Sequence, residues 1–284
     1  MSNQKEIPQV DIENIIRNKN EKLLKWLPGF VLRYIKKILH EKDMNEFLRQ
    51  HHHQYGLDFT DAILNEFGVK VKSHGLDNIP KTGGFIVASN HPLGGLDAIA
   101  LMDELGKVRS HMKFLVNDIL MNLKNLEALF VPVNKHGKNA AENIQRITET
   151  YSSENATLIF PAGLVSRKQN GVVQDLSWQK SFITQAVKHQ KNIIPVFIDA
   201  YISNFFYNVS FWRKKLGIKA NIEMFYLVNE MYKQRNKSIN IIFGEAIPYA
   251  TFTKEHSDTY WAEEVKKHVY KLKDGKKHLS TLSK

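Results

Sequence analysis

Residues 85–97 have the sequence FIVASNHPLGGLD, and this stretch decides the fold class of the chain. Its first part, Phe85–Ala88, is a short apolar run with β-branched residues, which is typical of a buried strand. Two glycines then permit a tight turn, and the apolar run Ala98–Leu105 follows with a helical pattern. A strand, a turn and a helix in this order predict one unit of an α/β sheet.

Similar units continue along the chain on the carboxyl side of this stretch. Further short apolar runs, rich in β-branched residues, occur at Lys113–Val116, Leu129–Val133, Thr157–Phe160, Ile193–Ile198 and Ile239–Phe243. Helical patterns lie between most of them, at Ala140–Tyr151, Gln179–His189 and Tyr260–Leu272. We therefore predict an α/β fold with a largely parallel sheet flanked by helices. Ligands bind at the carboxyl ends of the strands in such sheets, so the residues that directly follow each strand are the candidate site.

The first part of the chain predicts a helical extension. Apolar residues recur at helical spacing over residues 23–38, basic residues stand among them, and Pro28-Gly29 is expected to divide the stretch into two helices. Phe59–Phe67 predicts a further helix. We assign residues 1–68 to an N-terminal helical region and residues 69–284 to the main domain. The aromatic stripe of Trp26, Leu27, Phe30, Val31 and Tyr34, with Lys25, Arg33, Lys36 and Lys37, suits either a membrane-docking surface or packing on the main domain.

The composition of this 284-residue chain limits the kinds of site and partner that we expect. It has no cysteine, which excludes disulfides, thiolate metal sites and a cysteine nucleophile. No run of 18 uncharged apolar residues occurs, so we predict no transmembrane helix and a peripheral location on the cytoplasmic side of the cell membrane. The formal net charge of +11 favours an anionic membrane surface, an acidic substrate or a nucleic acid, or else a lysine-rich solvated surface. Because the basic residues are not interleaved with aromatics in any RNA-binding signature, we expect no nucleic-acid partner.

His91 and Asp97 carry the candidate chemistry. A strand at Phe85–Ala88 would deliver His91 to the carboxyl edge of the sheet, and Asp97 would begin the next helix. A carboxylate placed there can accept a hydrogen bond from one imidazole nitrogen and leave the other free to take a proton from a hydroxyl or an amine. The structural alternative makes Asp97 a helix cap and His91 a loop residue.

The same residues resemble the first sequence block of the lysophospholipid and glycerolipid acyltransferases, the family that makes phosphatidic acid. Asn90-His91 followed by Asp97 matches that block, in which the histidine is the base and the aspartate orients it. Three later segments resemble the second, third and fourth blocks in the expected order: residues 130–135, FVPVNK; residues 159–167, IFPAGLVSR; and residues 194–196, IPV. Four blocks in order, each at a predicted strand end, make the resemblance specific.

This sequence departs from the family pattern at several positions, and these departures bear on which acceptor lipid the protein uses. Five residues separate His91 from Asp97 where the family has four, Asn134-Lys135 stands where the second block ends in an arginine, and Ala162 replaces the glutamate of the third block. This variant is similar to the branch often labelled hemolysin-like, which includes bacterial enzymes that O-acylate lyso-aminolipids. A lyso-aminolipid and 1-acylglycerol-3-phosphate both remain candidate acceptors. We favour the lyso-aminolipid because Lys135 lacks the bidentate fork that suits phosphate.

The resemblance implies transfer of a fatty acyl group from a thioester, on acyl carrier protein or coenzyme A, to the hydroxyl of a lysolipid. It requires no metal and no cofactor beyond the thioester co-substrate. Backbone N–H groups near Gly94, Gly95 or Gly163 are candidates for stabilising the oxyanion, although a structural turn explains each glycine equally well. The other candidate substrate contacts follow the predicted strands: Asn90, Asn134, Lys135, Lys138, Ser166, Arg167 and Lys168. The basic residues among them could hold an acidic headgroup or the phosphates of the acyl donor, or form a solvated loop. Ser166 is either structural or a hydrogen-bond partner of the headgroup.

Other functions find less support in the sequence. His51-His52-His53 cannot share one metal on a helix, where consecutive side chains point about 100° apart. No G-x-S-x-G elbow of a serine hydrolase and no glycine-rich nucleotide motif occurs. Two alternatives stay open: a basic membrane-binding module without catalysis, and a thioesterase that uses the same base to release acyl chains to water.

Overall fold

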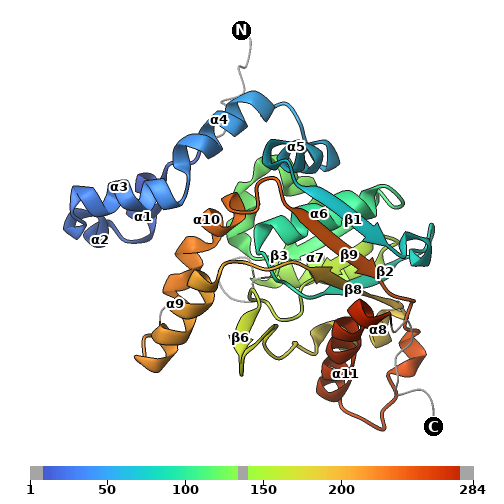
Figure 1. Ribbon diagram of the computed structural model, residues 1–284. Helices are drawn as coiled ribbons and strands as arrows, with labels where there is room; N and C mark the ends of the chain where they lie inside the picture. Colours follow the sequence, from blue (N-terminus) through green and yellow to red (C-terminus); the bar gives the residue numbers. More distant parts are fainter. Residues whose placement is uncertain (1–8, 134–139, 220, 276–284) are drawn as a thin grey trace.

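The computed structural model describes residues 9–133, 140–219 and 221–275 of the chain (Figure 1). Within these ranges the centre of the molecule is a seven-stranded sheet with the strand order β1-β9-β8-β2-β5-β3-β4. The strands are β1 (Lys70–His74), β2 (Phe85–Ser89), β3 (Met112–Val116), β4 (Phe130–Pro132), β5 (Ala156–Ile159), β8 (Ile193–Asp199) and β9 (Ser238–Phe243). The five strands from β8 to β4 are mutually parallel, β9 is antiparallel to β8, and β1 is parallel to β9. The predicted α/β class with a largely parallel sheet is confirmed.

Helices cover both faces of the sheet, which explains why β2 is buried along its whole length. Phe85 and Val87 point into one core with α5 (Leu57–Phe67) and α6 (Gly95–Gly106). Ile86 and Ala88 point into the other core with α7 (Ala140–Ser152), α8 (Ser181–His189) and α11 (Asp258–Lys271). Each large apolar side chain buried in these layers stabilises the fold by about 1.5–3 kcal/mol.

All six predicted strands are present, each within one residue of its expected ends. The structure adds elements that the sequence patterns did not predict. The edge strand β1 carries only one apolar residue, Val71, and three of its five residues are exposed to solvent. A hairpin of β6 (Arg167–Gln169) and β7 (Val172–Gln174) follows the third sequence block. The segment between β8 and β9 forms α9 (Asn204–Lys215), the 3-10 turn η4 (Ile222–Tyr226) and α10 (Leu227–Tyr232), which we call the distal lobe.

The N-terminal residues form an arm of helices that projects from the sheet domain (Figure 1). Its helices are α1 (Ile12–Lys19), α2 (Glu21–Trp26), α3 (Gly29–Ile38) and α4 (Glu41–His51). The predicted break at Pro28-Gly29 is confirmed, since α2 ends at Trp26 and α3 begins at Gly29. Trp26 is 87% exposed and Phe30 is 67% exposed, so this part of the stripe is not packed on the main domain. By contrast, α5 from the predicted N-terminal region packs directly against α6.

None of the helices in the described ranges combines the length and the apolar character that crossing a bilayer requires.

Candidate active site

Strand β2 places Asn90 and His91 at the edge of the sheet where the parallel strands end. The Asn90 side chain binds the end of the neighbouring strand β8, because its Nδ2 donates to the Ile198 carbonyl at 2.9 Å and its Oδ1 accepts from the Ile198 N–H at 2.7 Å. Asn90 is buried. Both ends of its amide are therefore used to fix the chain just before His91, and the predicted contact of Asn90 with substrate is not supported by this placement.

His91 and Asp97 lie in direct contact. The imidazole Nδ1 is 2.9 Å from Asp97 Oδ2, and the same oxygen accepts the backbone N–H groups of Leu93 at 2.8 Å and Gly94 at 3.0 Å. A carboxylate oxygen with these partners is an acceptor, so in the neutral imidazole the proton lies on Nδ1 and the lone pair on Nε2. Gly94 adopts a φ of +87°, which favours glycine, and the turn there accommodates the longer spacing between the two side chains.

Asp97 is fully buried at the first turn of α6. Burial raises the pKa of Asp97 above its ordinary value, while the hydrogen bonds from His91 and from the backbone of Leu93 and Gly94 lower it in part. Its other oxygen, Oδ1, has no hydrogen-bond partner among the described residues. Because water is excluded around Asp97, the attraction between its carboxylate and a protonated imidazole is stronger than it would be in solvent.

The aromatic ring of Phe160 forms one wall beside the imidazole. Phe160 directly follows β5, and its ring centroid lies 4.0 Å from that of His91 with an angle of 18° between the planes. The His91 side chain is 16% exposed, so most of the ring is covered by the protein. Phe160 lies within the third sequence block, but nothing in the sequence predicted that its ring would stack on His91.

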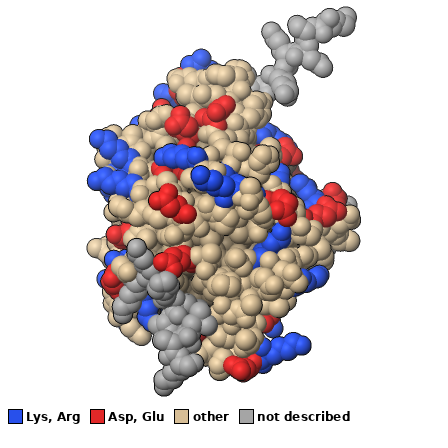
Figure 2. Space-filling model, turned by 90° about the vertical axis from the view of Figure 1, so that its right-hand side faces the viewer, with Lys and Arg blue, Asp and Glu red and all other residues tan. Residues whose placement is uncertain are grey.

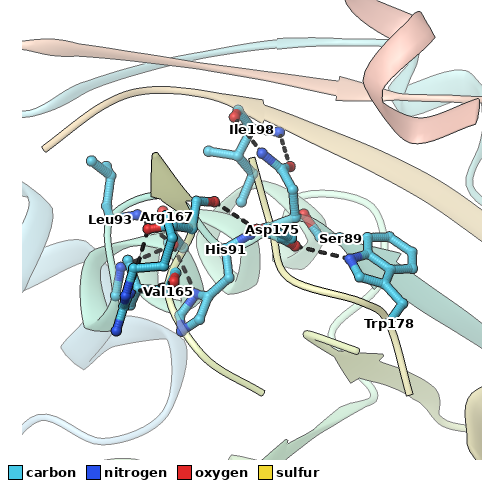
Figure 3. Close-up of polar contacts among 12 residues, drawn as sticks. Ser89, His91, Leu93, Val165, Arg167, Asp175, Trp178 and Ile198 are labelled. Carbon is cyan, nitrogen blue, oxygen red and sulfur yellow. Dashed lines mark hydrogen bonds and ion pairs between the residues drawn. The ribbon is translucent and has the colours of Figure 1, made fainter. Parts of the chain in front are cut away.

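A second buried carboxylate, Asp175, binds the backbone of the loop that carries His91. Its Oδ1 accepts from the His91 N–H at 3.2 Å and from the Ser166 hydroxyl at 2.6 Å, and its Oδ2 accepts from Trp178 Nε1 at 2.9 Å (Figure 3). The Ser166 N–H donates in turn to the His91 carbonyl at 2.8 Å. Asp175 thus joins the first and third sequence blocks. Of the two roles predicted for Ser166, this placement favours the structural one, since its hydroxyl is buried and bonded to Asp175.

Replacing Asp175 with alanine should destabilise the protein by about 3 kcal/mol or more. The change leaves three buried donors without their acceptor, and each lost partner costs about 1–3 kcal/mol. Chemical denaturation followed by circular dichroism measures this change in the free energy of unfolding. Asp77, which is exposed in a short 3-10 turn, provides the matched control, because Asp77→Ala should change the stability by less than about 0.5 kcal/mol. Equal effects of the two substitutions would contradict this role for Asp175.

Arg167 lies in a buried ion-pair cluster with the distal lobe. Its guanidinium is 3.1 Å from Glu223 Oε1, while Arg213 Nε is 2.8 Å from Glu223 Oε2, and all three residues are buried. The Arg167 guanidinium also lies 4.9 Å from the centroid of the Phe206 ring. The predicted contact of Arg167 with a headgroup is therefore not supported by this geometry. The arginine holds the third block against η4 and α9.

The remaining predicted contacts are placed as follows. The N–H of Gly94 donates to Asp97 and the N–H of Gly163 donates to the Phe160 carbonyl at 3.0 Å, so neither is available for an oxyanion. Gly95 is exposed and begins α6, where the first turn of a helix offers N–H groups without intrahelical acceptors. Lys168 is exposed on β6. The predictions for Asn134, Lys135 and Lys138 fall outside the described residues.

A family model described as Acyltransferase matches residues 14–278 of this chain. The chain belongs to the acyltransferase family. The match covers the arm from α1 onward, the sheet and all four sequence blocks. The resemblance to the lysophospholipid acyltransferases is confirmed, and this protein is an enzyme that transfers acyl groups.

Two relatives of this acyltransferase have the printed name lyso-glycine lipid O-acyltransferase. The protein from Bacteroides thetaiotaomicron is 43% identical over 264 residues, which cover 93% of this chain and 97% of the relative. The protein from Phocaeicola vulgatus is 40% identical over 264 residues, which cover 93% of this chain and 95% of the relative. Among solved structures, the 1-acyl-sn-glycerophosphate acyltransferase PlsC from Thermotoga maritima matches 75% of this chain and 81% of its own, with 20% identity and a TM-score of 0.47.

Proposed function

We propose that this acyltransferase moves a fatty acyl group from an acyl thioester to the hydroxyl of a lyso-aminolipid, with a lyso-glycine lipid as the preferred acceptor. The hydrogen-bonded pair of His91 and Asp97 at the carboxyl edge of the sheet is the observation that carries the proposal. The two relatives support the acceptor class, because their identity extends over nearly the whole length of both chains.

The geometry supports a direct transfer without a protein nucleophile. His91 Nε2 takes the proton of the acceptor hydroxyl while that oxygen attacks the carbonyl carbon of the thioester. The carbon–sulfur bond then breaks, the ester forms, and the imidazolium returns the proton to the departing thiolate. Asp97 holds the imidazole through Nδ1 and stabilises its positive charge between the two proton transfers. The thiol that leaves belongs to acyl carrier protein or coenzyme A, and the reaction requires no metal.

The N–H of Gly95 is the best-placed candidate for the oxyanion donor. Of the three glycine N–H groups predicted from the sequence, those of Gly94 and Gly163 are used inside the protein. Gly95 begins α6, and the partial positive charge at the start of a helix favours a negatively charged oxygen there. The same turn keeps Asp97 beneath His91, so the base and the oxyanion donor come from one segment.

The wall of the site near the third block is apolar, which fits an acceptor with a single carboxylate. Ala162 is buried in the core with Ile86 and Ala88, and it brings no carboxylate of its own. Because Arg167 is paired with Glu223, the guanidinium fork of the third block is not available to grip a phosphate dianion. A glycine headgroup carries one negative charge, for which an exposed lysine such as Lys168 is sufficient.

A competition assay tests this choice of acceptor. The purified enzyme receives one acyl thioester together with equal amounts of lyso-glycine lipid and lysophosphatidate, and mass spectrometry measures both products. We expect at least a tenfold preference in kcat/KM for the lyso-glycine lipid, which corresponds to about 1.4 kcal/mol of transition-state binding. A preference for lysophosphatidate would overturn the assignment of the acceptor and leave the acyltransferase assignment intact.

The arm is the part of the protein that we propose to dock on the membrane, where the lysolipid resides. Its exposed aromatic residues on α2 and α3, together with basic residues such as Arg33 and Lys37, suit the interface between headgroups and acyl chains. Each basic residue near an anionic membrane adds about 1 kcal/mol of attraction, which salt screens.

A further inference from the structure

The distal lobe exposes an unusual number of large apolar side chains. Leu216 is 70% exposed and Phe211 is 57% exposed, and further members of the set are Phe205, Trp212, Ile218, Ile222 and Phe225. They come from α9, from η4 and from the connection between them. A soluble protein rarely leaves a cluster of this kind in water unless the cluster meets a partner or a membrane.

The exposed charges on this segment are all of one sign. Residues 203–222 contain Arg213, Lys214, Lys215 and Lys219 but no aspartate or glutamate, and only Arg213 of the four is buried. The Lys215 ammonium lies 5.0 Å from the centroid of the Trp212 ring. Aromatic side chains flanked by lysines match the composition of protein surfaces that sit at the interface of an anionic bilayer.

The distal lobe continues the aromatic surface of the arm. The hydroxyl of Tyr34 on α3 is 3.4 Å from that of Tyr226 on η4, and Phe205 of α9 packs edge-on against Tyr226 with ring centroids 4.9 Å apart. Arm and lobe both lie on the left of the sheet domain in Figure 1. The opposite side, seen in Figure 2, carries lysine and arginine mixed with aspartate and glutamate, as expected for an ordinary solvated surface.

The lobe also packs against the turn that carries the catalytic pair. A side chain at Gly94 would meet Leu227 of α10 at 3.6 Å, and Glu223 of η4 holds Arg167 of the third block. The exposed aromatic residues are thus attached to a wall of the active site. A bilayer that touches this surface would lie next to the site in which the lysolipid is acylated.

We infer that the distal lobe docks on the surface of an anionic lipid bilayer and forms, with α2 and α3 of the arm, one two-part membrane-binding surface. The inference rests on the proposed function for its biological purpose, since a lysolipid acceptor resides in the bilayer. The positive charge of the lobe and its continuity with the arm favour a lipid surface over an acidic protein as the partner. An acidic protein such as acyl carrier protein would need the lysines but not the exposed aromatic rings.

Fluorescence of single exposed tryptophans tests the inference directly. Trp178 and Trp261 are buried, so Trp26→Phe leaves Trp212 as the only exposed indole among the four tryptophans of the chain. We expect vesicles of phosphatidylglycerol and phosphatidylcholine with brominated acyl chains to quench Trp212 in this variant, as they quench Trp26 in Trp212→Phe. Quenching of Trp26 alone would show that only the arm docks, and would overturn the inference.

A binding assay on the same vesicles measures the contribution of the lobe. Trp212→Ser combined with Phe225→Ser should weaken binding at least tenfold, while Ile144→Ser combined with Val187→Ser, exposed on α7 and α8, should change it less than twofold. Unchanged vesicle binding in the lobe variant would overturn the inference, whether or not that variant has lost binding to acyl carrier protein. The vesicle assays contain no acyl donor and no acceptor lipid, so they are independent of the proposed reaction. Activity on acceptor in detergent micelles should stay within twofold of the unsubstituted enzyme.

Discussion

Replacing His91 with alanine is expected to lower kcat by roughly 10²–10⁴-fold, the range that loss of a general base produces. Asp97 cannot take the hydroxyl proton in its place, because this carboxylate is fully buried behind the imidazole. The fold should survive, since the contacts of His91 with Asp175 and Ser166 use its backbone and persist in the variant. Initial rates of thiol release from the acyl thioester measure the effect.

His111 offers a matched control for this substitution. It is an exposed histidine just before β3, so His111→Ala should leave kcat within about twofold of the unsubstituted enzyme. If folded His91→Ala retains more than half of the activity, His91 is not the base and the proposed mechanism is wrong.

Replacing Asp97 with asparagine is expected to lower kcat by about 10²-fold or more, with a smaller change in KM. If the amide oxygen takes the position of Oδ2, the three hydrogen bonds persist, but the negative charge opposite the imidazolium is lost. The amide NH₂ then takes the position of Oδ1, which is buried and has no partner among the described residues. If the amide is turned, its NH₂ donates to Nδ1 and the imidazole takes the wrong tautomer. Both orientations weaken the base.

Steady-state kinetics with thermal unfolding separates this effect from misfolding. Asp103→Asn is the control, because Asp103 lies on the same helix α6 and burial likewise raises its pKa above the ordinary value. We expect Asp103→Asn to keep nearly full kcat. An Asp97→Asn enzyme with normal kcat and a normal melting temperature would show that the carboxylate serves only to cap α6.

The sequence predicts the sheet well where strands are buried on both faces. Runs such as Phe85–Ala88 and Ile193–Ile198 are uniformly apolar because helices cover both sides of a parallel sheet. The edge strand β1 gives no such signal, since only Val71 is apolar in it. The distal lobe was missed for a different reason. Its aromatic residues face solvent as well as the core, so α9 has no clear apolar stripe along the sequence.

The candidate site could be predicted only where its residues are close together in the sequence. His91 and Asp97 lie on one strand–turn–helix unit, and their contact follows from the geometry of that unit. Asp175 is 84 residues from His91, and Glu223 is 56 residues from Arg167. Contacts over such separations depend on the packing of whole elements, which leaves no pattern in a single sequence. Arg167 illustrates the consequence, because the fold turns a predicted ligand of the headgroup into a buried ion-pair partner.

The most direct test of the central claim is to measure which product receives the acyl group. Purified enzyme is mixed with a radiolabelled acyl thioester and lyso-glycine lipid, and the products are separated into diacylated lipid, free fatty acid and unreacted thioester. We predict that the label appears as an ester on the lyso-glycine lipid in amounts equal to the thiol released, and that His91→Ala lowers the rates of both by roughly 10²–10⁴-fold. Label recovered as free fatty acid would identify a thioesterase and contradict the proposal, and so would label that stays on the thioester in the presence of folded enzyme.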